Sequence, residues 1–210
     1  KLVADADVFL TNVRPSQLKE QGLDFDTLKL INPKLVYASV TGFGLEGEEA
    51  DKPGFDTAAF MAKSGFGWMM TPKGASPAPL RTAAGDHITG IATASGILAA
   101  LLKAQKSGEG CLVESSLLRS AAYAVGCDYG TWLRYGRIAR SRPREEAIVA
   151  INNYYRTSDE HWLFINARPG EPDWPDVARA AGLKHLLEDE RFGSLRDRRK
   201  NGVELIALLD

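Results

Sequence analysis

The sequence predicts an α/β fold in which a parallel sheet is followed by a smaller α+β part. Two short runs rich in β-branched and aromatic residues, 8–13 and 35–41, are separated by helical signals, which is the order of a βαβ unit. A longer segment, 80–106, has apolar residues at helical spacing and precedes a further strand-like run at 111–114. Beyond an arginine-rich stretch, two strand-like runs come before helical patterns, which indicates a separate small domain.

The βαβ unit occupies the first part of the chain. Residues 8–13 (VFLTNV) form an apolar run that is typical of a buried parallel strand. We expect a helix over 15–21, because proline suits a first helical turn and a glycine follows as the C-cap. A second short helix begins at Asp24 or Asp26 and is stopped by a proline, and residues 35–41 (LVYASVT) form the next strand.

Two loops and a helix connect this unit to the segment 80–106. Residues 42–54 form a charged loop that opens on Gly-Phe-Gly, and residues 55–64 are expected to be helical with a face of small side chains. Residues 65–79 are rich in Gly and Pro, and a connection of this length is often functional. Its aromatic and methionine residues fit a pocket wall as well as they fit ordinary packing.

The segment 80–106 carries the residue with the clearest chemical potential, Asp86. Small and apolar residues follow it at helical spacing: Ile88, Ile91, Ala92, Ser95, Leu98 and Leu102. Asp86 therefore stands where an N-cap belongs, facing unpaired N–H groups and the positive end of the helix dipole, which favour an ionised carboxylate. Position alone favours a simple cap over a catalytic group. The stretch 88–102 is expected to be a packed core helix.

The remaining elements complete the predicted two-domain organisation. A strand over 111–114 leads into a helix that begins at Ser115 or Ser116. The later elements are a β-hairpin with strands at 154–157 and 162–167, helices at 174–181 and 184–187, and a further helix from Asn201. We expect a large domain over 1–136, a linker over 137–147 and a small domain over 148–210. The arginine-rich linker would also suit contact with anionic groups.

The composition excludes several classes of function. The chain of 210 residues is 44% hydrophobic and 25% charged with a net charge of −1, which is typical of a globular protein and argues against nucleic-acid binding. No charge-free apolar run reaches 18 residues, so no membrane span is expected. The three histidines, His87, His161 and His185, are far apart in sequence, so no metal site is expected.

The cysteines and the two ends of the chain indicate its setting. Cys111 and Cys127 lie in apolar sequence and are expected to be reduced core thiols, which favours the cytoplasm. The chain begins without a signal peptide, as if inside a domain (KLVADADVFLTNV), and ends within a helical pattern (GVELIALLD). We therefore expect an internal fragment of a longer protein.

A succession of short motifs resembles the family III CoA-transferases, the group of formyl-CoA transferase and carnitine CoA-transferase. The matching motifs run along nearly the whole chain: Asp7-Val8, Asn12 to Pro15, Gly22-Leu23, Ile31 to Gly44, Lys52 to Asp56, Gly85-Asp86 with Thr89-Gly90, Gly96 to Leu101, Gly108 to Gly110, Val113 to Leu118, and Asp189 to Phe192. The resemblance implies a Rossmann-like large domain, incomplete in this chain, followed by the start of a smaller α+β domain. Family members are roughly twice as long, and they form interlocked homodimers.

The resemblance also implies roles for particular residues. Asp86 matches the catalytic aspartate, whose carboxylate attacks an acyl-CoA thioester, so that CoA passes through an aspartyl-CoA thioester to a small carboxylic acid. Asn12, Val13 and Arg14 match the segment that lines the CoA site, and Arg14 suits the CoA phosphates. A surface salt bridge is the alternative for Arg14. Lys52 lies near a basic CoA contact. A separate position, Asp56, matches an acidic residue close to the catalytic centre. CoA would be a substrate, with no permanently bound cofactor.

The same fold would also suit two alternative functions. The α-methylacyl-CoA racemases use the equivalent aspartate with a histidine in a Gly-His-Asp segment, but here that segment reads Gly54-Phe55-Asp56. Phenylalanine cannot act as a general base, so a transferase is favoured. A non-catalytic CoA-binding or dimerisation module is the second alternative. The resemblance also departs at 166–170 (NARPG), where some family members carry a run of glycines that closes over the active site.

Overall fold

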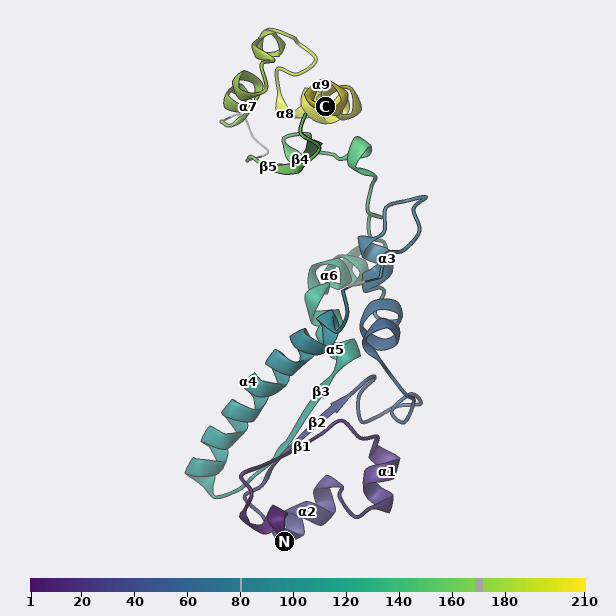
Figure 1. Cartoon of the computed structure of the whole chain (residues 1–210), viewed down its shortest axis with the longest axis vertical. Coiled ribbons are helices and arrows are strands. Elements are labelled where there is room, and N and C mark those ends of the chain that lie inside the picture. Colours follow the sequence, from purple (N-terminus) through teal and green to yellow (C-terminus); the bar gives the residue numbers. More distant parts are fainter. Residues whose placement is uncertain (80, 169–171) are drawn as a thin grey trace. The chain divides into compact units, whose positions relative to one another are not determined.

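The computed structural model describes residues 1–79, 81–168 and 172–210, and it divides the chain into two compact units (Figure 1). The first unit holds Lys1–Thr71 and Ser76–Ala139, and the second holds Pro72–Ala75 and Arg140–Asp210. The later change of unit, between Ala139 and Arg140, falls inside the segment 137–147.

The first unit is built from a small sheet and its surrounding helices. Its elements in chain order are η1 (Leu2–Asp5), β1 (Val8–Thr11), α1 (Pro15–Glu20), α2 (Phe25–Ile31), β2 (Val36–Thr41), η2 (Asp56–Lys63), α3 (Phe66–Met70), α4 (Ala84–Ser107), β3 (Leu112–Ser116), α5 (Leu117–Ala124) and α6 (Gly126–Tyr135). Of these, η1 is a 3-10 helix and η2 is a π-helix. The segment 65–79, expected to be a loop, contains the short helix α3.

The three strands form a parallel sheet in the order β1-β2-β3, which confirms the predicted α/β architecture. The register pairs Leu10 with Ala38 and Ala38 with Val113. The central strand β2 is buried along almost its whole length, as a parallel strand with covered faces should be. All three strands point the same way, so their carboxyl ends meet at one edge of the sheet.

The start of α2 is decided by hydrogen bonds. The Asp24 carboxylate accepts a hydrogen bond from the Thr27 N–H at 3.1 Å and one from the Thr27 hydroxyl at 2.8 Å. These bonds hold the pKa of Asp24 below its usual value. Asp24, and not Asp26, is therefore the N-cap of this helix.

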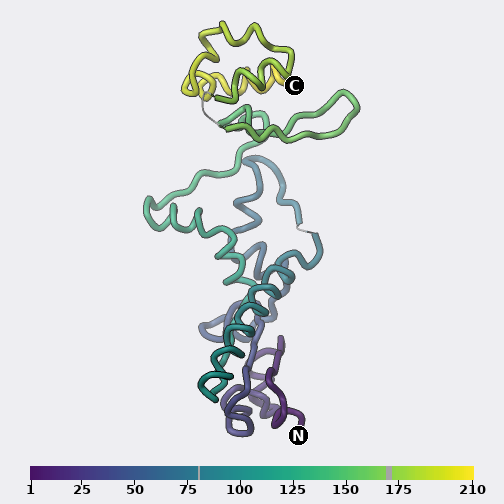
Figure 2. Tube along the Cα trace, turned by 90° about the vertical axis from the view of Figure 1, so that its left-hand side faces the viewer, coloured from purple at the N-terminus to yellow at the C-terminus, as the bar shows by residue number. Residues whose placement is uncertain are grey.

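Helix α4 runs along β2 and β3, and both views show it lying beside the strands (Figures 1 and 2). The side that faces the sheet is lined by small residues, of which Gly85, Thr89, Thr93 and Ala100 are buried. The large apolar side chains lie on the other side: Ile91 is 73% exposed and Leu98 is 63% exposed. The expectation that 88–102 is a packed core helix is therefore wrong within this unit, because the helix buries only its small residues, which permit close approach to the sheet.

By length and composition alone, α4 is also the one described helix that could cross a membrane. The sequence criterion missed it because that criterion demanded a run without charges. A single helix of this kind is weak evidence, since sheet-packed helices pass the same test. Buried hydroxyl groups at Thr89 and Thr93, on the side that meets the sheet, fit a helix packed within a protein fold.

The cysteines do not both belong to the core. Cys111 is partly buried, but Cys127 is exposed, so its prediction as a core thiol is wrong. Cys127 lies in α6, which begins after a break at Val125 and contains no buried residue. The sequence pattern predicted one helix here, whereas the structure has the two helices α5 and α6.

The second unit packs helices on a β-hairpin. Its elements are η3 (Arg144–Glu146), β4 (Asn152–Arg156), β5 (Trp162–Asn166), α7 (Trp174–Ala180), η4 (Lys184–Leu187), α8 (Leu195–Lys200) and α9 (Gly202–Leu209). Strands β4 and β5 are antiparallel, with Tyr154 opposite Phe164. Fully buried side chains of Phe192, Leu205 and Ile206 belong to its core.

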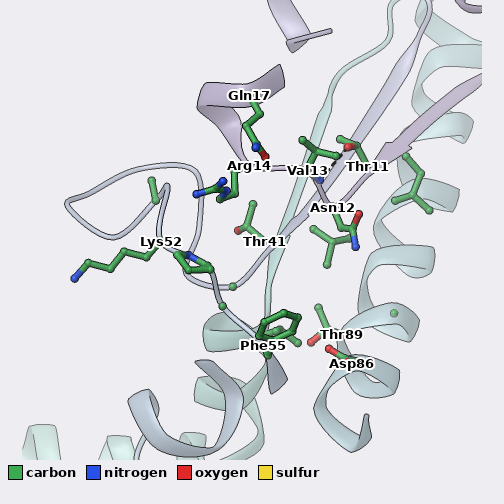
Figure 3. Close-up of a pocket in the computed structure, with 18 residues that line it drawn as sticks. Thr11, Asn12, Val13, Arg14, Gln17, Thr41, Lys52, Phe55, Asp86 and Thr89 are labelled. Carbon is green, nitrogen blue, oxygen red and sulfur yellow. Dashed lines mark hydrogen bonds between the residues drawn. The ribbon is translucent and has the colours of Figure 1, made fainter. Parts of the chain in front are cut away.

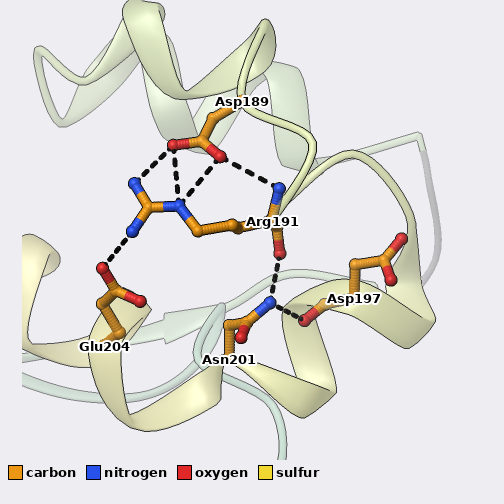
Figure 4. Close-up of polar contacts among 5 residues, drawn as sticks. All are labelled: Asp189, Arg191, Asp197, Asn201 and Glu204. Carbon is orange, nitrogen blue, oxygen red and sulfur yellow. Dashed lines mark hydrogen bonds and ion pairs between the residues drawn. The ribbon is translucent and has the colours of Figure 1, made fainter.

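A polar network ties the last helices of this unit together (Figure 4). The Arg191 guanidinium pairs with Asp189 at 2.6 Å and also with Glu204. The Asn201 amide donates to the carbonyl oxygens of Arg191 at 2.9 Å and Asp197 at 3.1 Å. Hydrogen bonds from Arg191 hold the pKa of Asp189 below its usual value. The network connects the loop after η4 to α8 and α9.

Candidate active site

A cavity of about 890 Å³ opens in the first unit where the strands end (Figure 3). Its lining comes from the segments that follow β1 and β2, from the loop before η2, from the first turns of α4 and from the start of α5. The lining residues are Leu10 to Arg14, Gln17, Val40 to Gly42, Ala50, Lys52 to Phe55, Asp86, Thr89, Gly90 and Leu117. In open α/β sheets, ligands bind at the carboxyl ends of the strands, so this is the expected place for a substrate.

Asp86 is the third residue of α4 and lines this cavity. The sequence position of Asp86 predicts an N-cap, but this prediction is wrong, because Asp86 lies inside the helix. The cap position is Ala83, which has a left-handed backbone with φ of 61° and provides no side-chain hydrogen bond. Asp86 still lies in the first helical turn, near the positive end of the helix dipole, and its side chain is exposed to the cavity.

A close contact behind this turn fixes its position. The Asp56 carboxylate accepts a hydrogen bond from the Gly85 N–H at 3.3 Å. A Cβ atom at Gly85 would lie only 2.2 Å from Asp56 Oδ1 and 2.4 Å from Cγ of Phe60, so only glycine fits here. Asp56 is absent from the described lining of the cavity and supports the turn that carries Asp86 instead.

The other side of the cavity carries its positive charges. Asn12, Val13 and Arg14 follow β1 directly, so the strand places all three at the rim. The Arg14 guanidinium donates a hydrogen bond to the carbonyl oxygen of Asp51 at 3.3 Å. The Asp51 carboxylate in turn accepts from the Ser16 N–H at 2.9 Å, and this bond and the nearby Arg14 charge lower the pKa of Asp51. These contacts hold the charged loop against the start of α1.

Lys52 lies on the same loop and is held loosely. Its ammonium group pairs with Glu49 at 3.1 Å, and Glu49 also pairs with Lys63 at 2.8 Å. Both lysines lower the pKa of Glu49, through hydrogen bonds and through their charge. The Lys52 side chain is largely exposed, and exposed pairs of this kind contribute little to stability, so Lys52 can exchange Glu49 for an anionic ligand.

Charge is therefore separated across the cavity. Figure 3 shows Arg14 on the side of α1 and Asp86 on the side of α4, whereas the exposed Lys52 side chain extends from the charged loop away from the cavity. This arrangement suits an elongated ligand with phosphates at one end and a reacting carbonyl at the other. Among residues 1–79, 81–168 and 172–210, no cluster of His, Cys, Asp and Glu is suited to holding a metal ion.

Sequence reasoning assigned no role to two lining residues beside Asp86. Thr89 is buried and lines the cavity, and its match to a family motif implies no role by itself. Its spacing of three residues from Asp86 places both on one helix face, and that signal could have identified it. Phe55 is 81% exposed in this chain and lies at the cavity between Gly54 and Asp56. No periodic pattern distinguishes it from a core aromatic residue.

The family model described as CoA-transferase family III matches residues 1–210. The chain belongs to CoA-transferase family III. Of the segment 166–170, where the glycine run of some family members is missing, Pro169 and Gly170 lie outside the described residues.

Curated relatives and solved structures are similar over nearly the whole chain. A cinnamoyl-CoA:phenyllactate CoA-transferase from Clostridium sporogenes is 35% identical over 205 residues, which cover 94% of this chain and 48% of that protein. An (R)-2-hydroxy-4-methylpentanoate CoA-transferase from Clostridioides difficile is 33% identical and covers 97% of this chain and 50% of that protein. The crystal structure of a CaiB/BaiF family protein from Brucella suis matches with a TM-score of 0.86 at 27% identity, covering 99% of this chain and 54% of that chain. The chain thus spans about half the length of these relatives.

Proposed function

We propose that this chain carries the CoA-binding and catalytic part of a transferase that moves CoA from an acyl-CoA donor to a carboxylic acid acceptor, with Asp86 as the nucleophile. One observation carries the proposal: Asp86 lies in the first turn of a long helix and faces a cavity whose other side holds Arg14 and Lys52. The family relatives that the chain resembles are named CoA-transferases, which supports the same reaction class.

The reaction needs only the Asp86 carboxylate as a covalent group. One carboxylate oxygen attacks the thioester carbon of the donor, the C–S bond breaks, and a mixed anhydride and free CoA thiolate result. The thiolate then attacks the Asp86 carbonyl, which expels the donor acid and leaves an aspartyl-CoA thioester. The acceptor carboxylate repeats these two steps in reverse order, so that a new acyl-CoA leaves and Asp86 is regenerated. The helix N-terminus favours the ionised Asp86 carboxylate before attack and the oxyanion that forms on the Asp86 carbonyl when the thiolate attacks it.

CoA would lie between the two sides of the cavity. Its thioester end reaches Asp86 past Gly90, which adds no side chain to the wall. Arg14 and Lys52 would bind the phosphates, and Asn12 and Val13 would line the path between. No permanently bound cofactor is required by this scheme. The proposal further includes an interlocked homodimer for the whole protein and a cytoplasmic setting.

Among the described lining residues, the racemase alternative lacks the histidine that would pair with Asp86. Phe55 occupies the place of the expected histidine and has no exchangeable proton. His87, next to Asp86, is absent from the described lining residues. A racemase would exchange the α-hydrogen of its acyl-CoA with solvent deuterium in the absence of any acceptor acid, whereas the proposed transferase would not.

The central test is covalent trapping of Asp86 in the whole protein. Incubation with an acyl-CoA followed by hydroxylamine or borohydride should modify Asp86, as read by peptide mass spectrometry, and Asp86→Ala should abolish turnover. Asp26→Ala is a matched control, because Asp26 is an exposed aspartate in the first turn of another helix, outside the cavity. No label at Asp86, or full activity in Asp86→Ala, would refute the proposal.

A non-catalytic CoA-binding module makes a different prediction. In that case acyl-CoA would bind without labelling any residue, and Asp86→Asn would change only the stability of the first turn. Once labelling is seen, an acceptor screen should include 2-hydroxy acids with apolar side chains and dicarboxylates. These are the acid classes in the names of the relatives from Clostridium sporogenes and Clostridioides difficile and of a succinate–glutarate CoA-transferase from Agrobacterium fabrum.

A further inference from the structure

We propose that the hydroxyl group of Thr89 is a second catalytic group, which donates a hydrogen bond to the oxyanion formed when Asp86 attacks a thioester. The inference rests on the proposed function. It assigns the reaction a specific hydrogen-bond donor in addition to the helix N-terminus.

The first argument is that the Thr89 hydroxyl has no partner. The residue is only 1% exposed, and its Oγ1 atom makes no hydrogen bond. A buried threonine in a helix ordinarily donates to the carbonyl oxygen four residues earlier, as Thr93 does to the Thr89 carbonyl oxygen at 2.7 Å. Buried polar groups are nearly always satisfied, so an unpaired hydroxyl at a cavity indicates a partner that arrives with the ligand.

The second argument is position. Thr89 follows Asp86 by three residues, so the two side chains share one face of α4. Both line the same cavity, and Figure 3 shows them next to one another at the end away from Arg14 and Lys52. An acyl carbonyl within bonding reach of the Asp86 carboxylate would therefore lie on the Thr89 side of the helix, where a small rotation of the buried Thr89 side chain brings its hydroxyl to the cavity.

The third argument is the state of the hydroxyl before reaction. Because Oγ1 has no partner, the Asp86 carboxylate does not accept a hydrogen bond from it in this structure. A donor bonded to that carboxylate would stabilise the ground state and weaken the nucleophile. A donor that is free until charge develops on the substrate oxygen lowers the barrier instead, because it stabilises the transition state alone.

The step balances without any added reactant. An Asp86 oxygen forms a bond to the thioester carbon, and the carbonyl π electrons move to the substrate oxygen, which becomes an oxyanion. Thr89 donates a hydrogen bond to this oxyanion and keeps its proton. The oxyanion then collapses, the C–S bond breaks and CoA thiolate leaves. Phe55 and Leu117 line the cavity with apolar side chains, and an acyl group seated against them would displace water from this end and strengthen the hydrogen bond.

The test compares three variants of the whole protein. Thr89→Val removes the hydroxyl with little change in shape, Thr89→Ser retains it, and Thr93→Val removes a buried hydroxyl one turn further on. Thr93 bonds to Ser115 at 2.6 Å and is absent from the described lining of the cavity. Single-turnover formation of the Asp86–CoA adduct and steady-state kinetics are measured for each, with unfolding followed in parallel.

We expect Thr89→Val to lower kcat and kcat/KM together by about 100-fold, the lower end of the range for one oxyanion donor. Its free energy of unfolding should be unchanged or slightly higher, because a buried unpaired hydroxyl group has been removed. Thr89→Ser should recover most of the rate. Thr93→Val should have a lower free energy of unfolding, because Ser115 loses its hydrogen-bond partner. The kcat of this variant should be unchanged.

Three results would overturn the inference. The first is an unchanged kcat in Thr89→Val while the wild-type protein labels Asp86, which refutes the role of Thr89 and leaves the proposed function standing. The second is an equal loss of rate in Thr89→Ser, which would assign the effect to the methyl group. The third is an absence of label at Asp86 in the wild-type protein, which refutes the proposed function and this inference together.

Discussion

Replacing Gly85 by alanine tests whether the support behind Asp86 matters for the site. The added Cβ would lie 2.2 Å from Asp56 Oδ1 and 2.4 Å from Phe60 Cγ, whereas ordinary contacts begin at 3.4 Å. Each contact must therefore open by about 1 Å. Phe60 is fully buried and its ring packs on Phe66 at a centroid distance of 5.3 Å, so it has little room to move. The first turn of α4 has to shift instead.

The expected cost follows from two opposing effects. Overpacking of a core contact destabilises by about 1–3 kcal/mol, while exchanging glycine for alanine within a helix returns about 0.5–1 kcal/mol. We place Gly85→Ala near the upper end of overpacking, because the clash involves two groups, and expect a net loss of about 2 kcal/mol. Asp86 is the next residue, so its carboxylate should move with the turn and lose its position for attack on the thioester.

Hydrogen exchange measures the destabilisation of the first turn, and covalent trapping measures the displacement of Asp86. Peptides from the first turns of α4 should exchange faster in Gly85→Ala, and the yield of labelled Asp86 should fall. Gly130→Ala is the matched control, since nothing lies within 4 Å of its Cβ in α6, and it should be neutral or stabilising. Wild-type exchange together with wild-type labelling in Gly85→Ala would show that the turn is not held by this contact.

Three further predictions concern the cavity and the core. Gly90→Ala, which meets no atom within 4 Å, should be neutral or stabilising for the fold but raise the KM for acyl-CoA severalfold, and an unchanged KM would mean that CoA does not pass this wall. Arg14→Ala should raise that KM by roughly 10-fold to 100-fold at low salt and less at high salt, the range for a charge-assisted hydrogen bond, whereas a salt-independent effect would contradict a phosphate contact. Burial raises the pKa of Tyr37 and of Tyr155 to about 12, so the neutral phenol is favoured in the folded state. Stability should be complete below about pH 10 and fall up to about pH 12, by about 1.4 kcal/mol per pH unit for each tyrosine, and changing either to phenylalanine should flatten this alkaline slope in urea unfolding.

Local patterns were sufficient for the βαβ unit. Strands β1 and β2 are continuous β-branched and aromatic runs, and the helix starts between them carry a proline or a capping aspartate. The order of such elements determines a parallel sheet, whose carboxyl edge then becomes the expected ligand site. Arg14 is placed at that edge by the end of β1 alone. Its partner Asp51 comes from a loop without periodicity, and no sequence pattern connects the two.

The orientation of α4 could not be obtained in the same way. An amphipathic helix is ordinarily assumed to bury its large apolar residues, and that rule turns Ile91 and Leu98 toward the core. The structure has the opposite side against the sheet within this unit. Resemblance to the family, and not periodicity, is what identified Asp86 on this helix. The same rule does not predict that Thr89 is buried, because a threonine among small residues does not contribute to a pattern of apolar residues.

The orientation of α4 and the placement of Asp86 and Thr89 at the cavity have one cause. Gly96 lies so close to β3 that a Cβ there would be 2.8 Å from the Val113 side chain, so small residues let α4 approach the strands. That approach carries the first turn of α4 to the edge where β1 and β2 end, and it turns the Thr89 side of the helix inward. A helix buried through its large residues would stand further from the sheet and present Asp86 elsewhere. The inverted burial of α4 is therefore what assembles the candidate site, since it brings a carboxylate, a buried hydroxyl and the strand ends to one cavity.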